Sequence, residues 1–144
     1  MALDKGLTLE LTADVPLPRA RVFGLLTDPA ELPLWWGPHG FTTPEIELDL
    51  RVGGGYRFTM QPPEGEPFHL SGTFTSVEPA TVAYTFMWEE PAPDDVETHV
   101  TLSLRPVDTG TRIHLLHRGF STEERVALHR GGWSDGFERM LAIR

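Results

Sequence analysis

The sequence predicts an α+β domain in which a curved antiparallel sheet of six or seven strands wraps around one long C-terminal helix. Apolar and polar residues alternate over seven separate stretches, which is the period of half-buried strands. Short turns join most of these stretches, as in antiparallel sheets. Residues 121–144 instead place apolar side chains at helical spacing. A single sheet of this kind can bury its apolar face only against that helix.

The first stretch, residues 7–14, predicts an opening strand. Two prolines end it, and Pro18 can occupy the first turn of a helix predicted for residues 19–27. The pair Asp28-Pro29 then ends this helix, and a second short helical turn is expected over residues 29–35. The sequence therefore predicts two short helices after the first strand.

Six further strands are predicted at residues 45–50, 56–60, 68–75, 82–88, 99–105 and 112–117. Three consecutive glycines at residues 53–55 separate the first two. They resemble a phosphate-binding loop only superficially, because no lysine or helix follows them. We expect a hairpin turn there.

The C-terminal segment has both a start signal and an apolar stripe. Ser121 followed by Glu124 predicts a capping box. The stripe consists of Val126, Trp133, Phe137, Met140 and Leu141. Three glycines interrupt this helix, each at a cost of about 1 kcal/mol relative to alanine. Gly132 and Gly136 lie one turn apart beside Trp133, so close packing or the approach of a ligand must compensate.

Composition excludes several classes of function. The length of 144 residues predicts one domain covering residues 1–144. A formal net charge of −9 without a basic cluster argues against nucleic acid or an anionic membrane as partner. Neither a signal peptide nor an apolar run of about 18 residues is found, so we expect a cytoplasmic protein. The lack of cysteine excludes disulfides, thiol nucleophiles and cysteine-bound zinc, and we expect no metal and no cofactor.

Seven motifs occur in an order that resembles a known family. They are Trp35-Trp36-Gly37-Pro38, Gly53-Gly54-Gly55-Tyr56-Arg57-Phe58-x-Met60, Gly72 with Val77-Glu78-Pro79, Thr85-Phe86-x-Trp88, Gly110-Thr111-Arg112, His117-x-Gly119-Phe120 and Gly132-Trp133. The chain is similar, from about Val15 to its end, to the family related to the C-terminal domain of the activator of the heat-shock protein ninety ATPase. This family belongs to the START-like, or SRPBCC, helix-grip superfamily.

The resemblance implies a sheet that grips the C-terminal helix, with a cavity between them for apolar or aromatic small molecules. It leaves the function open, because the superfamily includes lipid carriers, metabolite binders, polyketide cyclases and co-chaperone domains.

Alternation along the strands and helix gives a set of inward-facing candidates for a ligand-binding wall. They are Trp36, Phe58, Met60, Phe74, Phe86, Trp88, Trp133 and Phe137. Any one of them alone is more typical of a core than of a binding site, but together they favour an apolar pocket. His117 is the polar residue that alternation places on the same face. His129, one turn before Trp133, is expected near the pocket mouth.

Three functions remain open from the sequence. The first is non-catalytic binding of a small apolar or aromatic molecule. The second is an enzyme of the cyclase or dehydratase type, in which His117 and Tyr84 handle protons. The third is a protein-interaction module with a chaperone partner. No catalytic motif or residue is assigned. The sequence also does not decide whether the exposed side of the sheet forms a homodimer.

Overall fold

The structure is a computed structural model that describes residues 7–143. Its elements are β1 (Leu7–Val15), α1 (Arg19–Thr27), the 3-10 turn η1 (Leu32–Leu34), β2 (Thr42–Leu48), β3 (Gly55–Gln61), β4 (Phe68–Glu78), β5 (Thr81–Trp88), β6 (Thr98–Val107), β7 (Gly110–Phe120) and α2 (Glu123–Leu141). The strands form one antiparallel sheet in the order β1-β7-β6-β5-β4-β3-β2. The predicted helix-grip fold is confirmed, including both short helical segments.

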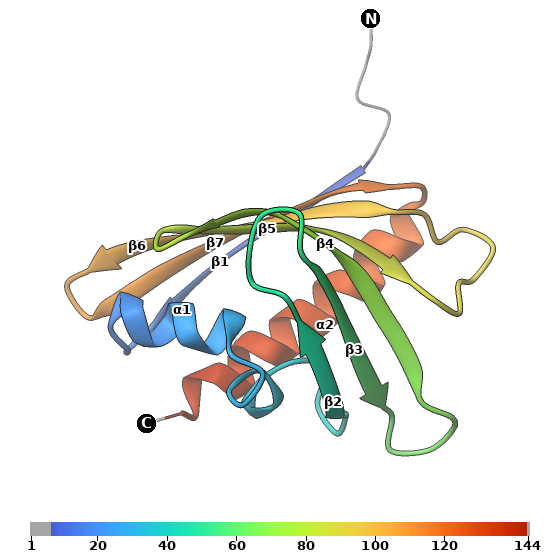
Figure 1. Ribbon diagram of the computed structural model, residues 1–144, viewed down its shortest axis with the longest axis horizontal. Coiled ribbons are helices and arrows are strands. Elements are labelled where there is room, and N and C mark those ends of the chain that lie inside the picture. Colours follow the sequence, from blue (N-terminus) through green and yellow to red (C-terminus); the bar gives the residue numbers. More distant parts are fainter. Residues whose placement is uncertain (1–6, 144) are drawn as a thin grey trace, which may run out of the picture.

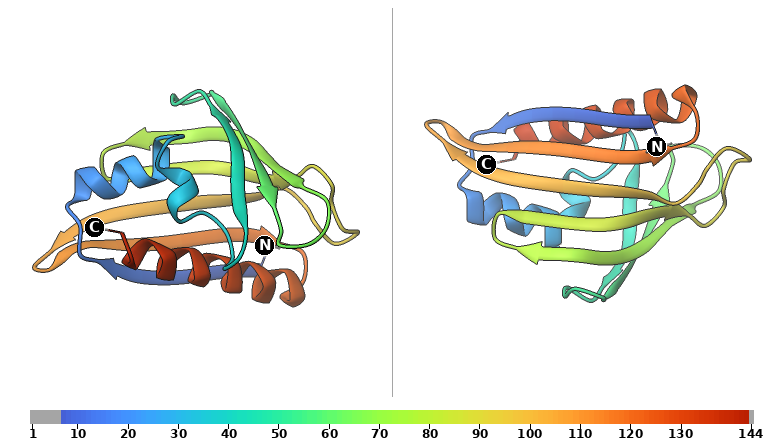
Figure 2. Two further views of the ribbon diagram at one scale, coloured as in Figure 1. Left: turned by 90° about the horizontal axis from the view of Figure 1, so that it is seen from below. Right: turned by 90° about the horizontal axis from the view of Figure 1, so that it is seen from above.

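The sheet curves, and its concave face holds the helices (Figure 1). Viewed from the helical side, α2 runs along β1 and β7 at one edge, whereas α1 lies over the middle of the sheet (Figure 2). The strands β2 and β3 bend down from the rest of the sheet and pass in front of α2 in the view of Figure 1. Within residues 7–143, no helix has the length and apolar character needed to cross a membrane.

A glycine on β4 lets three strands approach closely on the inner face. A Cβ atom on Gly72 would lie 2.0 Å from the carbonyl oxygen of Thr85 on β5 and 2.8 Å from the ring of Tyr56 on β3. The Tyr56 hydroxyl donates to that same carbonyl oxygen at 2.6 Å. Only glycine fits here, because any side chain would displace the tyrosine and the β5 backbone.

The Trp-Trp-Gly-Pro segment after η1 is held from both helices. The Trp35 indole, only 1% exposed, donates through Nε1 to the carbonyl oxygen of Leu25 in α1 at 2.7 Å. Arg139 in α2 donates through Nη1 to the carbonyl oxygens of Trp36 at 2.8 Å and Gly37 at 3.1 Å. These bonds satisfy backbone groups that no strand or helix pairs, and they fix the segment above the sheet.

The start of α2 differs from the prediction by one residue. Thr122 is the N-cap, and its hydroxyl accepts from the backbone N–H of Arg125 at 3.1 Å. The Ser121 hydroxyl instead donates to the carbonyl oxygen of Asp94 in the β5–β6 loop. The predicted Ser121–Glu124 capping box is therefore wrong, because a distant loop engages the serine and leaves the next hydroxyl to cap the helix. The helix ends at Leu141 rather than at residue 144, which lies outside the described residues.

The three glycines of α2 have three different environments. A Cβ on Gly131 would meet nothing within 4 Å, and one on Gly132 would meet only the Pro38 ring at 3.8 Å. A Cβ on Gly136 would lie 3.2 Å from both the ring and the carbonyl oxygen of Trp35. Close packing thus explains Gly136, whereas Gly132 faces open space beside the Trp-Trp-Gly-Pro segment.

Replacing Gly131 with alanine is expected to raise the free energy of unfolding by about 0.5–1 kcal/mol, because alanine favours the helix and finds no steric obstacle here. Urea denaturation measures this change. Gly136→Ala is the matched control, and we expect it to show no such gain because Trp35 is tightly packed. A destabilised Gly131→Ala protein would contradict the open environment of this position.

Candidate functional site

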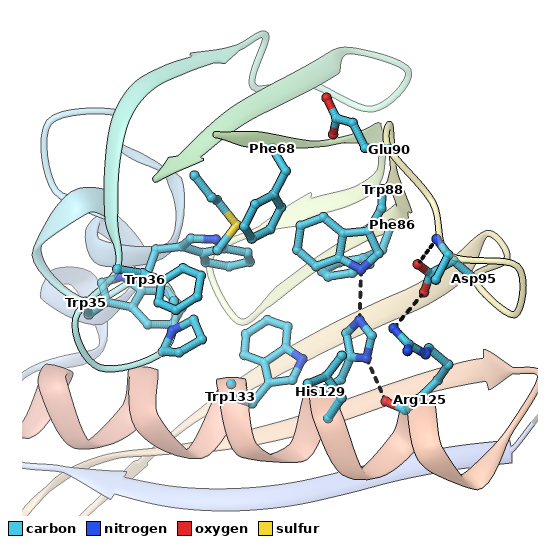
Figure 3. A pocket seen from close by; sticks show the side chains of 17 residues that line it. Trp35, Trp36, Phe68, Phe86, Trp88, Glu90, Asp95, Arg125, His129 and Trp133 are labelled. Atoms are coloured by element: carbon cyan, nitrogen blue, oxygen red, sulfur yellow. Dashed lines mark hydrogen bonds and ion pairs between the residues drawn. The ribbon is translucent and has the colours of Figure 1, made fainter. Parts of the chain in front are cut away.

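A pocket of about 330 Å³ opens between α2, the segment after η1 and the inner face of the sheet (Figure 3). Its size is at the lower end of the range for small-molecule sites, roughly 300–1,000 Å³. Its lining consists of Trp35, Trp36, Gly37, Pro38, Phe41, Met60, Phe68, Phe86, Trp88, Glu90, Ala92, Asp95, Arg125, Leu128, His129, Gly132 and Trp133. Most of these side chains are apolar or aromatic.

Aromatic rings make most of the pocket wall. All 4 tryptophans of the chain line it. Trp36 contacts Trp133 edge-on, with 5.3 Å between ring centroids. On the opposite side Phe68 contacts Trp88 edge-on at 5.3 Å. Such edge-to-face contacts stabilise the rings in fixed orientations, so the wall is largely formed before a ligand enters.

The sequence-predicted set divides between the pocket and the core. Trp36, Met60, Phe86, Trp88 and Trp133 line the pocket. Phe58, Phe74, Phe137 and His117 are buried but lie outside its lining. The prediction that these last four would line a ligand pocket is therefore not met by the geometry.

Neighbouring rings cover the three phenylalanines that do not line the pocket. Phe58 lies behind Trp36, at 5.0 Å between centroids. Phe137 stacks on Trp35 at 6.1 Å. Phe74 lies further along β4, against Tyr56 at 5.6 Å. Each is buried as predicted, but packs against another aromatic ring instead of bordering the cavity.

Several lining residues were not among the sequence candidates. Helical spacing could have found Arg125 and Leu128, because they lie one turn before His129 and Gly132, respectively, on the face of α2 beside Trp133. His129, expected near the pocket mouth, does line the pocket, as does Gly132. Strand alternation likewise places Phe68 on the inward face of β4. The lining residues from the β5–β6 loop, Glu90, Ala92 and Asp95, carry no periodic signal.

His117 is fully buried behind the pocket wall and serves to orient Trp133. Its Nδ1 accepts from the Trp133 indole N–H at 3.0 Å, so Nδ1 carries no proton. Its Nε2 lies 2.8 Å from the hydroxyl of Thr98, which donates to the carbonyl oxygen of Phe86 at 3.2 Å. The ring is therefore neutral, with its proton on Nε2 and both nitrogens engaged.

His129 orients Trp88 in the same manner on the other side of the pocket. The Trp88 indole N–H donates to His129 Nε2 at 3.0 Å, and His129 Nδ1 donates to the carbonyl oxygen of Arg125 at 2.6 Å (Figure 3). Two tryptophans of the wall are thus held by two neutral histidines, one buried behind the wall and one within it. A protonated ring would have to give up its bond to the indole.

Burial lowers the pKa of both histidines. Desolvation is the main cause for His117, whose pKa lies well below its usual value and is lowered further by His129 and His99. Desolvation also lowers the pKa of His129, although the bond to the Arg125 carbonyl opposes the shift. Both rings therefore stay neutral at a pH at which an exposed histidine is charged.

The free energy of unfolding is expected to fall as the pH drops below about 6.5, the pKa of an unperturbed histidine. Below this pH the unfolded chain binds protons at these histidines that the folded chain does not bind. The free energy of unfolding therefore falls by up to about 1.4 kcal/mol per pH unit for each such histidine. Urea denaturation at about pH 7.5 and 5.5 measures the difference, above the range in which most carboxylates titrate. Equal stability at both values would contradict the neutral, buried rings.

Charged side chains gather at one end of the pocket. Glu90 binds the backbone N–H of His69 at 2.8 Å and the His69 ring at 2.6 Å. Arg125 lies 3.2 Å from Asp94 and 3.6 Å from Asp95. The guanidinium of Arg125 is thus already paired with two carboxylates. Glu90 adds a further negative charge, so this end of the pocket is acidic.

Among residues 7–143, two groups of surface side chains are close enough to share a metal ion: His39 with Asp135 and Glu138, and His69 with Glu89 and Glu90. Both are accounted for by ion pairs within the protein. His39 Nε2 lies 2.9 Å from Glu138, and Glu89 receives two bonds from Arg57 at 2.9 Å. Neither group provides buried ligands aimed at a common point, and we assign no metal to them.

Comparisons with known proteins agree with this architecture. The family model described as Activator of Hsp90 ATPase homolog 1-like protein matches residues 16–143. The solved structure of the AHSA1 protein from Silicibacter pomeroyi is 30% identical, with a TM-score of 0.82 over 94% of this chain and 96% of that chain. A protein from Nitrosomonas europaea is 27% identical, with a TM-score of 0.78 over 94% and 92%.

A third solved structure, of a protein from Chromobacterium violaceum, has a TM-score of 0.83 at 23% identity, over 94% of each chain, and supports the fold alone. Among curated proteins, none matches the chain significantly.

Proposed function

We propose, from the premise that this chain belongs to the Activator of Hsp90 ATPase homolog 1-like protein family, that it binds a small apolar or aromatic molecule in the pocket beside α2. The observation that carries the proposal is the cavity of about 330 Å³ lined by all 4 tryptophans. A ligand entering it would bury apolar surface against preformed aromatic walls, which is the usual driving force of such sites.

The polar groups of the wall support binding rather than turnover. The indole N–H groups of Trp88 and Trp133 are engaged by histidines. His117 and Tyr84, which an enzymatic mechanism would have used, lie outside the lining. The cyclase or dehydratase alternative therefore has no observation in its favour. The same is true of a chaperone partner, and binding without catalysis remains the proposal.

Native mass spectrometry of the protein purified from its own host tests this function. A discrete mass above the 16.1 kDa of the chain, lost on denaturation, is the expected result and would identify the ligand. Titration with tert-butylbenzene, followed by tryptophan fluorescence, provides an independent readout because every tryptophan lines the pocket. A chain of unmodified mass that also fails to bind this probe would overturn the proposal.

A further inference from the structure

We propose that the ligand of this pocket is an organic cation, with an aromatic or apolar body between the tryptophans and a quaternary or protonated amine toward the acidic end. The inference rests on the proposed binding function and specifies its chemical class. Two independent features carry it: the lack of available donors on the aromatic wall, and the sign of the charge at the pocket end.

The aromatic wall offers ring surfaces but no indole donor that is both unpaired and accessible from the cavity. Trp35 donates to the carbonyl oxygen of Leu25, and Trp133 donates to His117. Neither acceptor residue, Leu25 or His117, belongs to the lining. Trp88 donates to His129. The fourth indole nitrogen, on Trp36, has no partner within residues 7–143, but it is buried and presents almost no accessible surface to the cavity.

A ligand that needs hydrogen-bond donors, such as a carboxylate, therefore finds no accessible one on these four rings. Aromatic faces instead carry negative electrostatic potential and attract cations, with tryptophan the most effective ring. The wall consequently suits a cation with an apolar body better than an anion of the same size.

The charged residues of the lining favour the same sign. Glu90 and Asp95 contribute carboxylates, and the side chain of Asp95 is only 9% exposed. Arg125 is the cation of the lining, but Asp94 and Asp95 already pair with it. An anionic ligand would have to compete with these carboxylates for Arg125, whereas a cation would be attracted to them. Glu90 adds negative charge above Phe68 and Trp88 in the view of Figure 3, although its carboxylate already accepts from the backbone and ring of His69. The net charge of −9 adds a favourable long-range field.

Three probes of similar size separate charge from shape. Phenyltrimethylammonium is the cation, tert-butylbenzene is its neutral carbon isostere and benzenesulfonate is an anion. Binding is followed by tryptophan fluorescence and calorimetry. We expect the cation to bind about tenfold more tightly than its neutral isostere. Added salt should weaken the binding of the cation and leave that of tert-butylbenzene unchanged.

The variant Glu90→Gln locates the charge effect. It is expected to weaken binding of the cation about threefold and leave the neutral isostere unaffected. Glu78→Gln is the matched control, because it makes the same change at the far end of the β4–β5 hairpin. Equal effects of the two variants would show that only the overall charge matters and would overturn the assignment of the cation to this end.

The outcomes distinguish this inference from the function on which it rests. Equal affinities for the cation and its isostere, or tighter binding of benzenesulfonate, would overturn the inference and leave ligand binding intact. Failure of every probe to bind would overturn the proposed function together with the inference.

Discussion

The variant Gly132→Leu is expected to abolish ligand binding while preserving the fold. Gly132 lines the pocket, and its Cβ would approach only the Pro38 ring, at an ordinary distance of 3.8 Å. A leucine side chain would therefore extend into the cavity without disturbing backbone. Leucine also favours a helix over glycine by up to about 1 kcal/mol, which offsets small adjustments. We expect affinity for tert-butylbenzene or phenyltrimethylammonium to fall about 100-fold or more, since the side chain occupies the ligand's volume.

Gly131→Leu is the matched control for this variant. It makes the same substitution one residue earlier, on the exposed side of α2, where nothing lies within 4 Å. Calorimetric titration of both variants separates the effect of blocking the pocket from the effect of a change in helix propensity. Urea denaturation establishes that both variants are folded. If both variants bind as tightly as the parent protein, the ligand does not occupy this pocket. Trp133→Ala would be a weaker test, because it also removes a buried ring that His117 engages.

The variant His117→Leu is expected to lower the free energy of unfolding by about 3 kcal/mol. Leucine fills a similar space but leaves the buried Trp133 N–H without an acceptor, at a cost of about 1–3 kcal/mol. It also removes the bond to the Thr98 hydroxyl, worth about 1 kcal/mol. In addition, the loss of stability below about pH 6.5 should become smaller, because one of the two buried imidazoles is gone.

His117→Asn separates the hydrogen bond from the histidine ring. An asparagine can place its carbonyl oxygen near the position of Nδ1 and accept from Trp133, so a smaller loss of stability is expected than for leucine. Urea denaturation of the three proteins at neutral pH, and again at about pH 5.5, measures both effects. A leucine variant of unchanged stability but altered ligand affinity would assign His117 to the ligand and refute its structural role.

The sheet could be predicted in detail because its signal is local. Each strand alternates apolar and polar residues, so the period alone gives its existence and its inward face. The start of α2 could not be predicted to the residue. Ser121 and Thr122 are both competent caps, and the choice depends on Asp94, a residue of the β5–β6 loop that engages Ser121.

The pocket was predicted only in part, for a different reason. Phe58 and Met60 share the inward face of β3, yet only Met60 reaches the cavity because Trp36 covers Phe58. Alternation tells which side of the sheet a residue occupies but not how far it lies from empty space. His117 illustrates the same limit, since it faces inward and yet lies behind Trp133.

The sequence by itself determined the seven strands, the long C-terminal helix and most of the faces that they bury, because these follow from short-range periodicity. Leu141, predicted in the apolar stripe of the helix, and Leu50, predicted in the second strand, are instead exposed, the latter beyond the end of β2. The tertiary structure decided which buried side chains border a cavity. That choice depends on where the Trp-Trp-Gly-Pro segment sits above the sheet. Its place is fixed by the bonds from Trp35 to Leu25 and from Arg139 to Trp36, the second of which joins residues 103 positions apart. No local period encodes a contact of that range.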